Sequence, residues 1–328
     1  MNAFPDIRLR RLRQTEGLRN MFGQAMPGPG KFIWPIFVVE GRNKREAIDA
    51  MPGQFRWSTD MLLRELEPAV KSGMGGIMIF GVVPSSEKDP SGSAASRKDG
   101  VVQNAVRQIR REFSGLVVAT DVCFCGYTDH GHCGFLDRNG DVDNDVTNAG
   151  LARIALSHAE AGAHVVAPSA MMDGQVAAIR AALDQDGFTQ TLLMSYSTKF
   201  ASSMYGPFRV AEQSAPKSGD RKGYQAPHND LRQALRESVL DEAEGADILM
   251  VKPALFNLDV LCRLREQTRL PIAAYNVSGE YAMLVASADR GWGDLRNMVR
   301  ESTQSIVRAG ADIILSYWAN RYDEFFRE

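Results

Sequence analysis

Residues 245–253 read Gly-Ala-Asp-Ile-Leu-Met-Val-Lys-Pro, and this stretch shows the unit from which the chain is built. An amphipathic segment over 230–244 ends at Gly245, the residue type that most readily adopts the positive φ found just after a helix. The apolar run that follows is continuous rather than alternating, as in a parallel strand buried on both faces. Gly162 and Gly310 stand in the same position, each before an Ala and another apolar run. The chain therefore predicts repeated helix–strand units.

Apolar runs of this kind recur along the chain. They cover residues 32–39, 76–82, 116–122, 164–170, 192–197, 248–253, 271–277 and 312–317. Helical patterns lie between them at 59–72, 104–113, 147–161, 174–185, 230–244 and 294–309. Eight strand–helix units in roughly 300 residues predict an α/β protein with a (β/α)8 TIM barrel. The alternative, a doubly wound open sheet, normally carries a glycine fingerprint after its first strand, and Val38-Val-Glu-Gly-Arg is not one.

The first residues differ from the rest of the chain because they show no clear periodicity. Arg8, Arg10, Arg11 and Arg13 make this segment basic, and Pro27-Gly-Pro-Gly separates it from the first apolar run. We expect an extended N-terminal arm over 1–30 and a TIM-barrel catalytic domain over 31–328. A frayed terminus is the alternative for the arm.

Composition excludes several classes of protein. The 328 residues are 44% hydrophobic and 24% charged, with a net charge of −2, which is typical of a globular protein and gives no reason to expect nucleic acid or an anionic membrane as partner. No apolar run approaches a membrane span, and the N-terminus lacks the apolar region of a secretory signal. Three of the four cysteines fall within eleven residues, which favours a metal and a reducing, cytoplasmic location. The fourth, Cys262 on a predicted helix, is expected to be a buried structural thiol.

Two lysines stand at the ends of adjacent predicted strands, where a TIM barrel carries its active site. Lys199 follows the fifth apolar run and Lys252 lies near the end of the sixth. Burial disfavours a charged amine and a second ammonium repels it, so both effects lower the pKa of Lys252 toward neutrality. A neutral amine can attack a carbonyl carbon and form a Schiff base. The alternative is a lysine that forms an ion pair with a carboxylate in the barrel.

Other polar residues are expected at the same edge of the barrel. They follow or end the third, fourth, seventh and eighth runs and are Asp121, Ser169, Ser278 and Tyr317. Two long insertions, over 123–146 and from 199 to about 225, follow the third and fifth runs. Loops of this length are usually functional when they are ordered, and in a barrel both would lie over the catalytic face.

The three clustered thiols form a second candidate site. Cys123, Cys125 and Cys133 have the spacing C-x-C-x7-C. Thiolates are soft ligands that select zinc under cytosolic conditions. Three thiolates would leave the fourth position open, as in a catalytic zinc site, whereas a fourth ligand from His130 or His132 would close it as a structural one. Chance clustering is the remaining alternative.

These motifs together resemble the porphobilinogen synthase family, also called the 5-aminolevulinate dehydratases. The resemblance rests on Asp121-Val-Cys-Phe-Cys, His130-Gly-His-Cys-Gly, Ala167-Pro-Ser-Ala-Met-Met-Asp-Gly, Met194-Ser-Tyr-Ser-Thr-Lys-Phe-Ala-Ser-Ser, Tyr205-Gly-Pro-Phe-Arg, Gly219-Asp-Arg-Lys, Met250-Val-Lys-Pro-Ala and Val277-Ser-Gly-Glu-Tyr-Ala-Met. It covers nearly the whole chain from about residue 5, and the two lysine motifs together are highly specific.

The resemblance implies a reaction and the residues that perform it. Two molecules of 5-aminolevulinate would condense asymmetrically to porphobilinogen with loss of two waters, the first common step of tetrapyrrole (heme and chlorophyll) biosynthesis. Lys199 would hold the propionate-side substrate and Lys252 the acetate-side substrate, each as a Schiff base. Asp121 and Ser169 would be polar groups around the reacting amine.

The resemblance also implies how the two substrates and the metals are bound. Arginine suits a carboxylate because its guanidinium donates two parallel hydrogen bonds. The acetate-side carboxylate would be bound by Arg209, Arg221 and Gln225, and the propionate-side carboxylate by Ser278 and Tyr317. The cysteines match the zinc form of the family, in which zinc is a Lewis acid near the acetate-side substrate. Glu237 matches the glutamate of an allosteric magnesium site, and no organic cofactor is expected.

The basic arm resembles the segment that wraps a neighbouring barrel in the family's homo-octamer. Two alternatives remain open on the residues alone. A class I Schiff-base aldolase on the same fold would need one lysine and would leave the cysteine cluster without a purpose. A non-catalytic barrel with a structural zinc and a partner-binding arm would need neither lysine. Product formation from 5-aminolevulinate alone separates both from the first interpretation.

Overall fold

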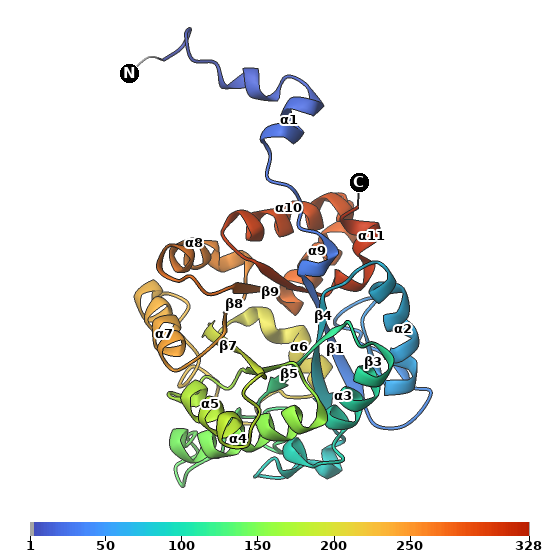
Figure 1. The fold of residues 1–328 in the computed structure, drawn as a ribbon, viewed down its shortest axis with the longest axis vertical. Coiled ribbons are helices and arrows are strands. Elements are labelled where there is room, and N and C mark those ends of the chain that lie inside the picture. Colours follow the sequence, from blue (N-terminus) through green and yellow to red (C-terminus); the bar gives the residue numbers. More distant parts are fainter. Residues whose placement is uncertain (1–2, 328) are drawn as a thin grey trace.

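Eight apolar strands lie side by side and close into a parallel barrel in the computed structural model, which describes residues 3–327 (Figure 1). The strands follow one another in chain order, and pairing of Phe32 with Ile314 joins the last strand to the first. They are β1 (Phe32–Val39), β4 (Gly76–Val82), β5 (Val117–Val122), β6 (Val165–Pro168), β7 (Leu192–Lys199), β8 (Ile248–Lys252), β9 (Ile272–Asn276) and β10 (Ile313–Ser316). The prediction of a (β/α)8 TIM barrel is confirmed.

Helices surround the barrel, where apolar helix faces are buried against the strands. The helices after the arm are α2 (Thr59–Lys71), α3 (Val101–Glu112), α4 (Asn144–Ala161), α5 (Gln175–Gln185), α6 (Gly206–Glu212), α7 (Leu231–Ala243), α8 (Leu258–Gln267), α9 (Ser278–Asp289), α10 (Leu295–Arg308) and α11 (Tyr322–Phe325). Within residues 3–327 no helix is both long enough and apolar enough to cross a membrane. Cys262 on α8 is exposed, so the expectation of a buried thiol there is wrong.

The glycines that suggested the repeating unit do end their helices. Gly162, Gly245 and Gly310 have φ values of 102°, 102° and 115°. This left-handed conformation is unfavourable for residues that have a Cβ, but not for glycine. It turns the chain directly into the next strand. The pattern that predicted the barrel therefore has a conformational basis.

A small hairpin that the apolar pattern does not predict is added to the barrel beside β1. Strands β2 (Arg45–Ala47) and β3 (Phe55–Trp57) pair in an antiparallel manner, and β3 pairs in a parallel manner with the last part of β1, where Arg56 is opposite Phe37. Both strands are three residues long and most of their side chains are exposed or half-buried. The hairpin therefore lies at the carboxyl end of β1, which is the catalytic end of a TIM barrel.

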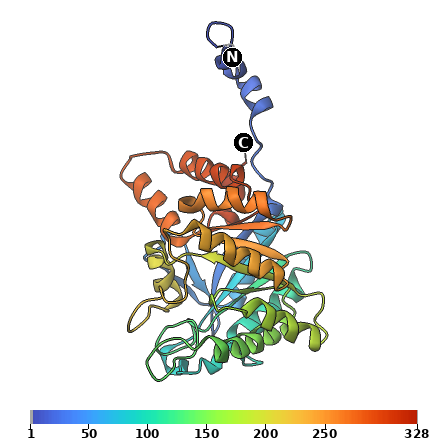
Figure 2. The ribbon, with the colours of Figure 1, turned by 90° about the vertical axis from the view of Figure 1, so that its left-hand side faces the viewer.

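The N-terminal segment projects away from the barrel in both views (Figures 1 and 2). It contains a short 3₁₀ helix over Leu9–Arg13 and α1 over Glu16–Phe22, and neither has a buried residue. Large apolar side chains on it are exposed, namely Phe4, Ile7, Leu9, Leu12, Met21 and Phe22. Apolar side chains that are exposed in this way present a surface suited to another protein.

Candidate active site

The two lysines lie side by side at the carboxyl ends of adjacent strands. Lys199 ends β7 and Lys252 ends β8, and the two residues are register partners across the pair of strands. Their side chains are 5% and 4% exposed, so both amines are enclosed by protein. Both also face one ring, because the Nζ atoms lie 5.6 Å and 4.9 Å from the centre of the Tyr196 ring. The structure thus brings together the pair that the sequence predicts.

Lys252 is surrounded by aromatic rings. Its Nζ lies 4.1 Å from the ring centre of Tyr275, 4.9 Å from that of Phe208 and 5.4 Å from that of Tyr205. Burial, with repulsion from the neighbouring Lys199, lowers the pKa of Lys252 to about 7. Ring faces attract a cation, but here the loss of water is the larger effect. Near neutral pH a substantial fraction of this amine is therefore neutral and nucleophilic.

Lys199 is held by backbone rather than by a carboxylate. Its Nζ donates a hydrogen bond of 2.5 Å to the carbonyl oxygen of Ser169, the residue after β6. Asp121 on β5 lines a small cavity together with the two lysines, and its Oδ1 is buried without a hydrogen-bond partner. Burial, with the nearby carboxylate of Glu212, raises the pKa of Asp121 to about 7. A carboxyl group with this pKa beside two amines can take up and release a proton near neutrality.

The three predicted metal ligands converge. Cys123, Cys125 and Cys133 are all buried, and their sulfurs lie within 4.8 Å of one another. The Cys123 and Cys125 sulfurs are 3.3 Å apart. Neither candidate histidine joins them. The ring nitrogens of His132 lie 3.2 Å from the Tyr224 hydroxyl and 3.0 Å from the Ser218 carbonyl oxygen, and those of His130 lie 3.1 Å from the His132 backbone nitrogen and 3.4 Å from the Pro90 carbonyl oxygen. A buried group of three thiols is a donor set that fits a soft divalent metal, and the observed contacts leave the fourth position without a histidine.

The sequence did not predict that a buried carboxylate lies beside this cluster. Glu212, the last residue of α6, is 3% exposed, and its Oε2 lies 3.3 Å from the Cys125 sulfur. A glutamate at the end of a short helix resembles any solvated surface residue, so its burial could not be predicted from the sequence.

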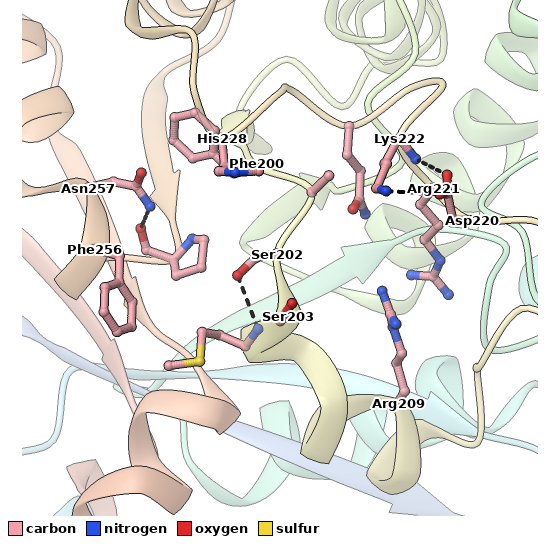
Figure 3. A pocket seen from close by; sticks show the side chains of 14 residues that line it. Phe200, Ser202, Ser203, Arg209, Asp220, Arg221, Lys222, His228, Phe256 and Asn257 are labelled. Atoms are coloured by element: carbon pink, nitrogen blue, oxygen red, sulfur yellow. Dashed lines mark hydrogen bonds and ion pairs between the residues drawn. The ribbon is translucent and has the colours of Figure 1, made fainter.

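Two cavities meet at a pair of arginines. The inner one is lined by both lysines, Asp121 and Cys125, and its volume of about 10 Å³ is near that needed for one water molecule. The outer one measures about 720 Å³. Arg209 and Arg221 line both, and Figure 3 shows their guanidinium groups facing one another.

Several polar atoms at this junction have no protein partner. The Nε atoms of Arg209 and Arg221 are buried and unbonded, as are both side-chain polar atoms of Gln225. Arg221 uses its terminal nitrogen to hold the carbonyl oxygens of Gly131 and Ser214, at 2.9 Å and 2.6 Å. Buried donors without partners are costly, and an anionic ligand would satisfy them. The three residues expected to bind one carboxylate therefore lie together and have donors available for it.

The remaining two predicted carboxylate binders are placed differently. The Ser278 hydroxyl accepts from the Phe208 backbone N–H at 2.9 Å and donates to the Met204 carbonyl oxygen at 3.3 Å. The Tyr317 hydroxyl lies 3.1 Å from the Tyr275 hydroxyl. Both side chains are buried, and neither is among the residues that line the two cavities just described. Tyr275 connects Tyr317 to the Lys252 amine, whereas Ser278 contacts the segment that leads into α6.

Glu237 lies away from the barrel mouth. It is half-buried on α7 and faces a separate pocket of about 580 Å³ that is also lined by Asp173, Asp241 and Glu244. Burial, with the negative charge of Asp173 and Glu244, raises the pKa of Glu237. Burial likewise raises the pKa of Asp241 to about 7. Carboxylates that repel one another in this way would be stabilised by a cation.

Comparison with known proteins agrees with this geometry. Residues 6–325 match the family model of delta-aminolevulinic acid dehydratase. The chain is 52% identical to the delta-aminolevulinic acid dehydratase of Methanothermobacter thermautotrophicus over 318 residues, which is 96% of each chain, and 51% identical to that of Escherichia coli over 312 residues, or 95% of each.

A solved structure supports the same assignment. The delta-aminolevulinic acid dehydratase (porphobilinogen synthase) of Toxoplasma gondii, determined in complex with the reaction product porphobilinogen, superposes with a TM-score of 0.94 at 40% identity, covering 98% of this chain and 90% of that one. The resemblance seen in the motifs is therefore confirmed over the whole barrel. This chain belongs to the delta-aminolevulinic acid dehydratase family.

Proposed function

We propose that this chain condenses two molecules of 5-aminolevulinate to porphobilinogen, with loss of two waters, through Schiff bases on Lys199 and Lys252. The observation that carries the proposal is the buried pair of lysines in register on β7 and β8, one with a pKa of about 7. The asymmetric product requires two copies of one substrate to be held in different orientations. Two amines in unlike surroundings, one on a carbonyl oxygen and one among aromatic rings, provide that difference.

The chemistry at each lysine follows from its surroundings. The neutral Nζ attacks the ketone carbon of a substrate, a C–N bond forms, and the ketone oxygen leaves as water after two proton transfers. A Schiff base on each lysine accounts for the two waters lost. One C–C and one C–N bond then join the substrates, and each lysine is released when its C–N bond breaks. Asp121, whose Oδ1 is unbonded, is the group we assign to hold the transferred proton.

The unpaired donors at the junction of the cavities support the assignment of the acetate-side carboxylate to Arg209, Arg221 and Gln225. Arg209 and Arg221 line both cavities and Gln225 lines the outer one, so a substrate held there by its carboxylate would point its ketone inward. We assign the propionate-side carboxylate to Ser278 and Tyr317. Ser278 bonds Phe208 and Tyr317 bonds Tyr275, and the rings of Phe208 and Tyr275 both lie within 5 Å of the Lys252 amine. For Ser278 this requires the hydroxyl to exchange its bonds to Met204 and Phe208.

We propose that Cys123, Cys125 and Cys133 hold a zinc ion, since three buried thiols fit zinc better than magnesium. When bound, zinc supplies a Lewis acid at the edge of the inner cavity, where Cys125 is one of the lining residues. The protein's part is to keep this edge dry and to place the thiols beside Asp121 and the lysines.

The test of the function is direct. Purified protein incubated with 5-aminolevulinate as the sole substrate should form a pyrrole, detected by its colour with an acidic aldehyde reagent. Formation of the pyrrole excludes the class I aldolase and the non-catalytic barrel, because neither makes this product. Absence of pyrrole from folded, zinc-loaded protein would contradict the proposal.

We propose that Glu237 binds an activating magnesium ion in the acidic pocket on α7. The Glu237→Gln variant should lose stimulation by magnesium while its zinc-dependent basal activity stays within about twofold of the wild type, because the pocket lies away from the lysines. The matched control is Glu266→Gln, an exposed glutamate on α8. Activity is measured as magnesium is titrated. Equal stimulation of the Glu237→Gln variant and the wild type would place the site elsewhere.

We propose that the arm contacts the barrel of a second copy and that the assembly is an octamer. The exposed apolar side chains and arginines of the arm contact nothing in their own barrel that would bury them. Removal of residues 1–24 should therefore give smaller oligomers with low activity, because the surface that joins the copies is lost. Light scattering measures the size of the assembly. An octamer of unchanged mass would contradict this role.

A further inference from the structure

Helix α6 is held at its carboxyl end by two cations from outside the loop that carries it. Arg56, on strand β3, donates from Nε to the Ala211 carbonyl oxygen at 2.6 Å and from Nη2 to the Val210 carbonyl oxygen at 2.7 Å. Lys88, in the loop after β4, donates from Nζ to the Gln213 carbonyl oxygen at 2.6 Å. The last carbonyls of a helix lack partners within the helix and carry partial negative charge, so cations suit them.

The position of α6 decides whether the lysines are open to solvent. Phe208 on α6 lies 4.9 Å from the Lys252 amine and packs edge-on to Phe80, with ring centres 5.0 Å apart. Arg209, the next residue, lies between the outer cavity and the inner one. The inner space of about 10 Å³ cannot hold a substrate with a carboxylate, a ketone and an amine. This structure therefore represents a closed arrangement, and a movement of α6 would open the space beside Lys252.

The other end of α6 is fixed by contacts of a different kind. A Cβ on Gly279 would lie only 2.5 Å from the Met204 carbonyl oxygen, a close approach that does not depend on the bonds of the Ser278 hydroxyl. The chain before α6 is thus packed tightly against the start of α9, where even a methyl group would not fit. Movement of α6 is consequently expected at its carboxyl end, the end that Arg56 and Lys88 hold.

Both cations are half-buried and bond backbone carbonyl oxygens. Arg56 is half-buried on the β2–β3 hairpin, which lies at the catalytic end of β1. Lys88 is half-buried as well, and the carboxylate of Glu212 attracts it. Three bonds to backbone carbonyls are short and charge-assisted, but unlike a buried ion pair they leave no unpaired negative charge when they break.

We propose that Arg56 and Lys88 are positioning residues that hold α6 closed over Lys252 during the reaction. The role in catalysis rests on the proposed function, whereas the closure itself does not. Neither residue lines the inner cavity, which contains the lysines, or the outer one, so they act through Arg209 and Phe208 rather than on the substrate.

The experiment compares hydrogen–deuterium exchange with steady-state kinetics. In Arg56→Ala, backbone amides of residues 203–214 should exchange about tenfold faster, while the barrel strands keep the wild-type rate. KM for 5-aminolevulinate should rise about tenfold and kcat should fall by less than about threefold, because the closed state still forms but is less populated. Arg56→Lys, which can keep one bond, should recover part of both effects. Lys88→Gln should show the same pattern more weakly, because it removes one bond.

Arg45→Ala is the matched control, since Arg45 is on the same hairpin and packs on Phe55 instead of bonding α6. Unchanged exchange at residues 203–214 in both Arg56→Ala and Lys88→Gln, relative to Arg45→Ala, would overturn the proposal. So would equal loss of kcat in Arg56→Lys and Arg56→Ala without a change in KM. If Arg56→Ala fails to fold, Lys88→Gln decides alone. Failure of the wild type to form pyrrole would contradict the proposed function but would leave the exchange result able to confirm or refute closure.

Discussion

The Lys252→Ala variant is expected to fall below about 10⁻³ of the wild-type rate of porphobilinogen formation. The buried amine at this position is the one whose pKa of about 7 makes it a nucleophile, and no other group among the residues lining the inner cavity except Lys199 can form a Schiff base. Lys252→Arg should be equally inactive, because a guanidinium keeps the charge but cannot act as this nucleophile. Turnover is measured as pyrrole formed per chain.

The pH profile adds an independent check on the same amine. The neutral form is the reactive one, so its fraction rises from about one-tenth at pH 6 to about nine-tenths at pH 8 for a pKa of about 7. kcat/KM should therefore rise through pH 7 and then level off. Lys71→Ala is the control, since Lys71 is an exposed lysine on α2 that pairs with Glu67. A wild-type profile that rises only above pH 9 would show that the amine is not perturbed by burial.

Removal of the metal is expected to have an effect of similar size. A strong chelator should abolish turnover and zinc should restore it, and Cys133→Ala should bind less than about one-tenth of the zinc held by the wild type. The cluster offers three sulfur ligands, and the variant keeps only two, which bind the zinc ion less tightly. Bound zinc is counted by elemental analysis of the purified protein, and turnover is measured in parallel.

Cys262→Ser serves as the matched control, because Cys262 is an exposed thiol on α8, outside the cluster. It should keep both zinc and activity. Circular dichroism of the Cys133→Ala variant shows whether the barrel is intact. Full activity in metal-free protein, or normal zinc content in Cys133→Ala, would refute the role of the cluster.

The strands could be predicted from the sequence because each is buried on both faces and therefore reads as a continuous apolar run. The predicted run at 192–197 stops two residues short of the end of β7, where the pairing with β8 shifts register between Ser195 and Thr198. Helix α9 was not predicted, since its sequence, Ser-Gly-Glu-Tyr-Ala-Met-Leu-Val-Ala-Ser-Ala-Asp, places apolar residues around the whole helix rather than along one stripe.

The site was predictable where chemistry is tied to strand ends and to rare residue types. Two lysines and three cysteines are conspicuous in apolar surroundings, and the structure brings each set together. The aromatic rings around Lys252 were not predictable as a site, because a tyrosine in an apolar run resembles any core residue. Glu212 and Arg56 were missed for another reason: their importance arises from contacts between segments far apart in the chain.

Reductive trapping shows which lysines carry the substrate. Wild-type protein, Lys199→Ala and Lys252→Ala are each incubated with 5-aminolevulinate, reduced with borohydride, digested, and mapped by peptide mass. Substrate should be found attached to Lys199 and to Lys252 in the wild type, and to Lys199 alone in Lys252→Ala. The account is contradicted if no lysine carries substrate in the wild type, or if Lys252→Ala retains near-normal turnover.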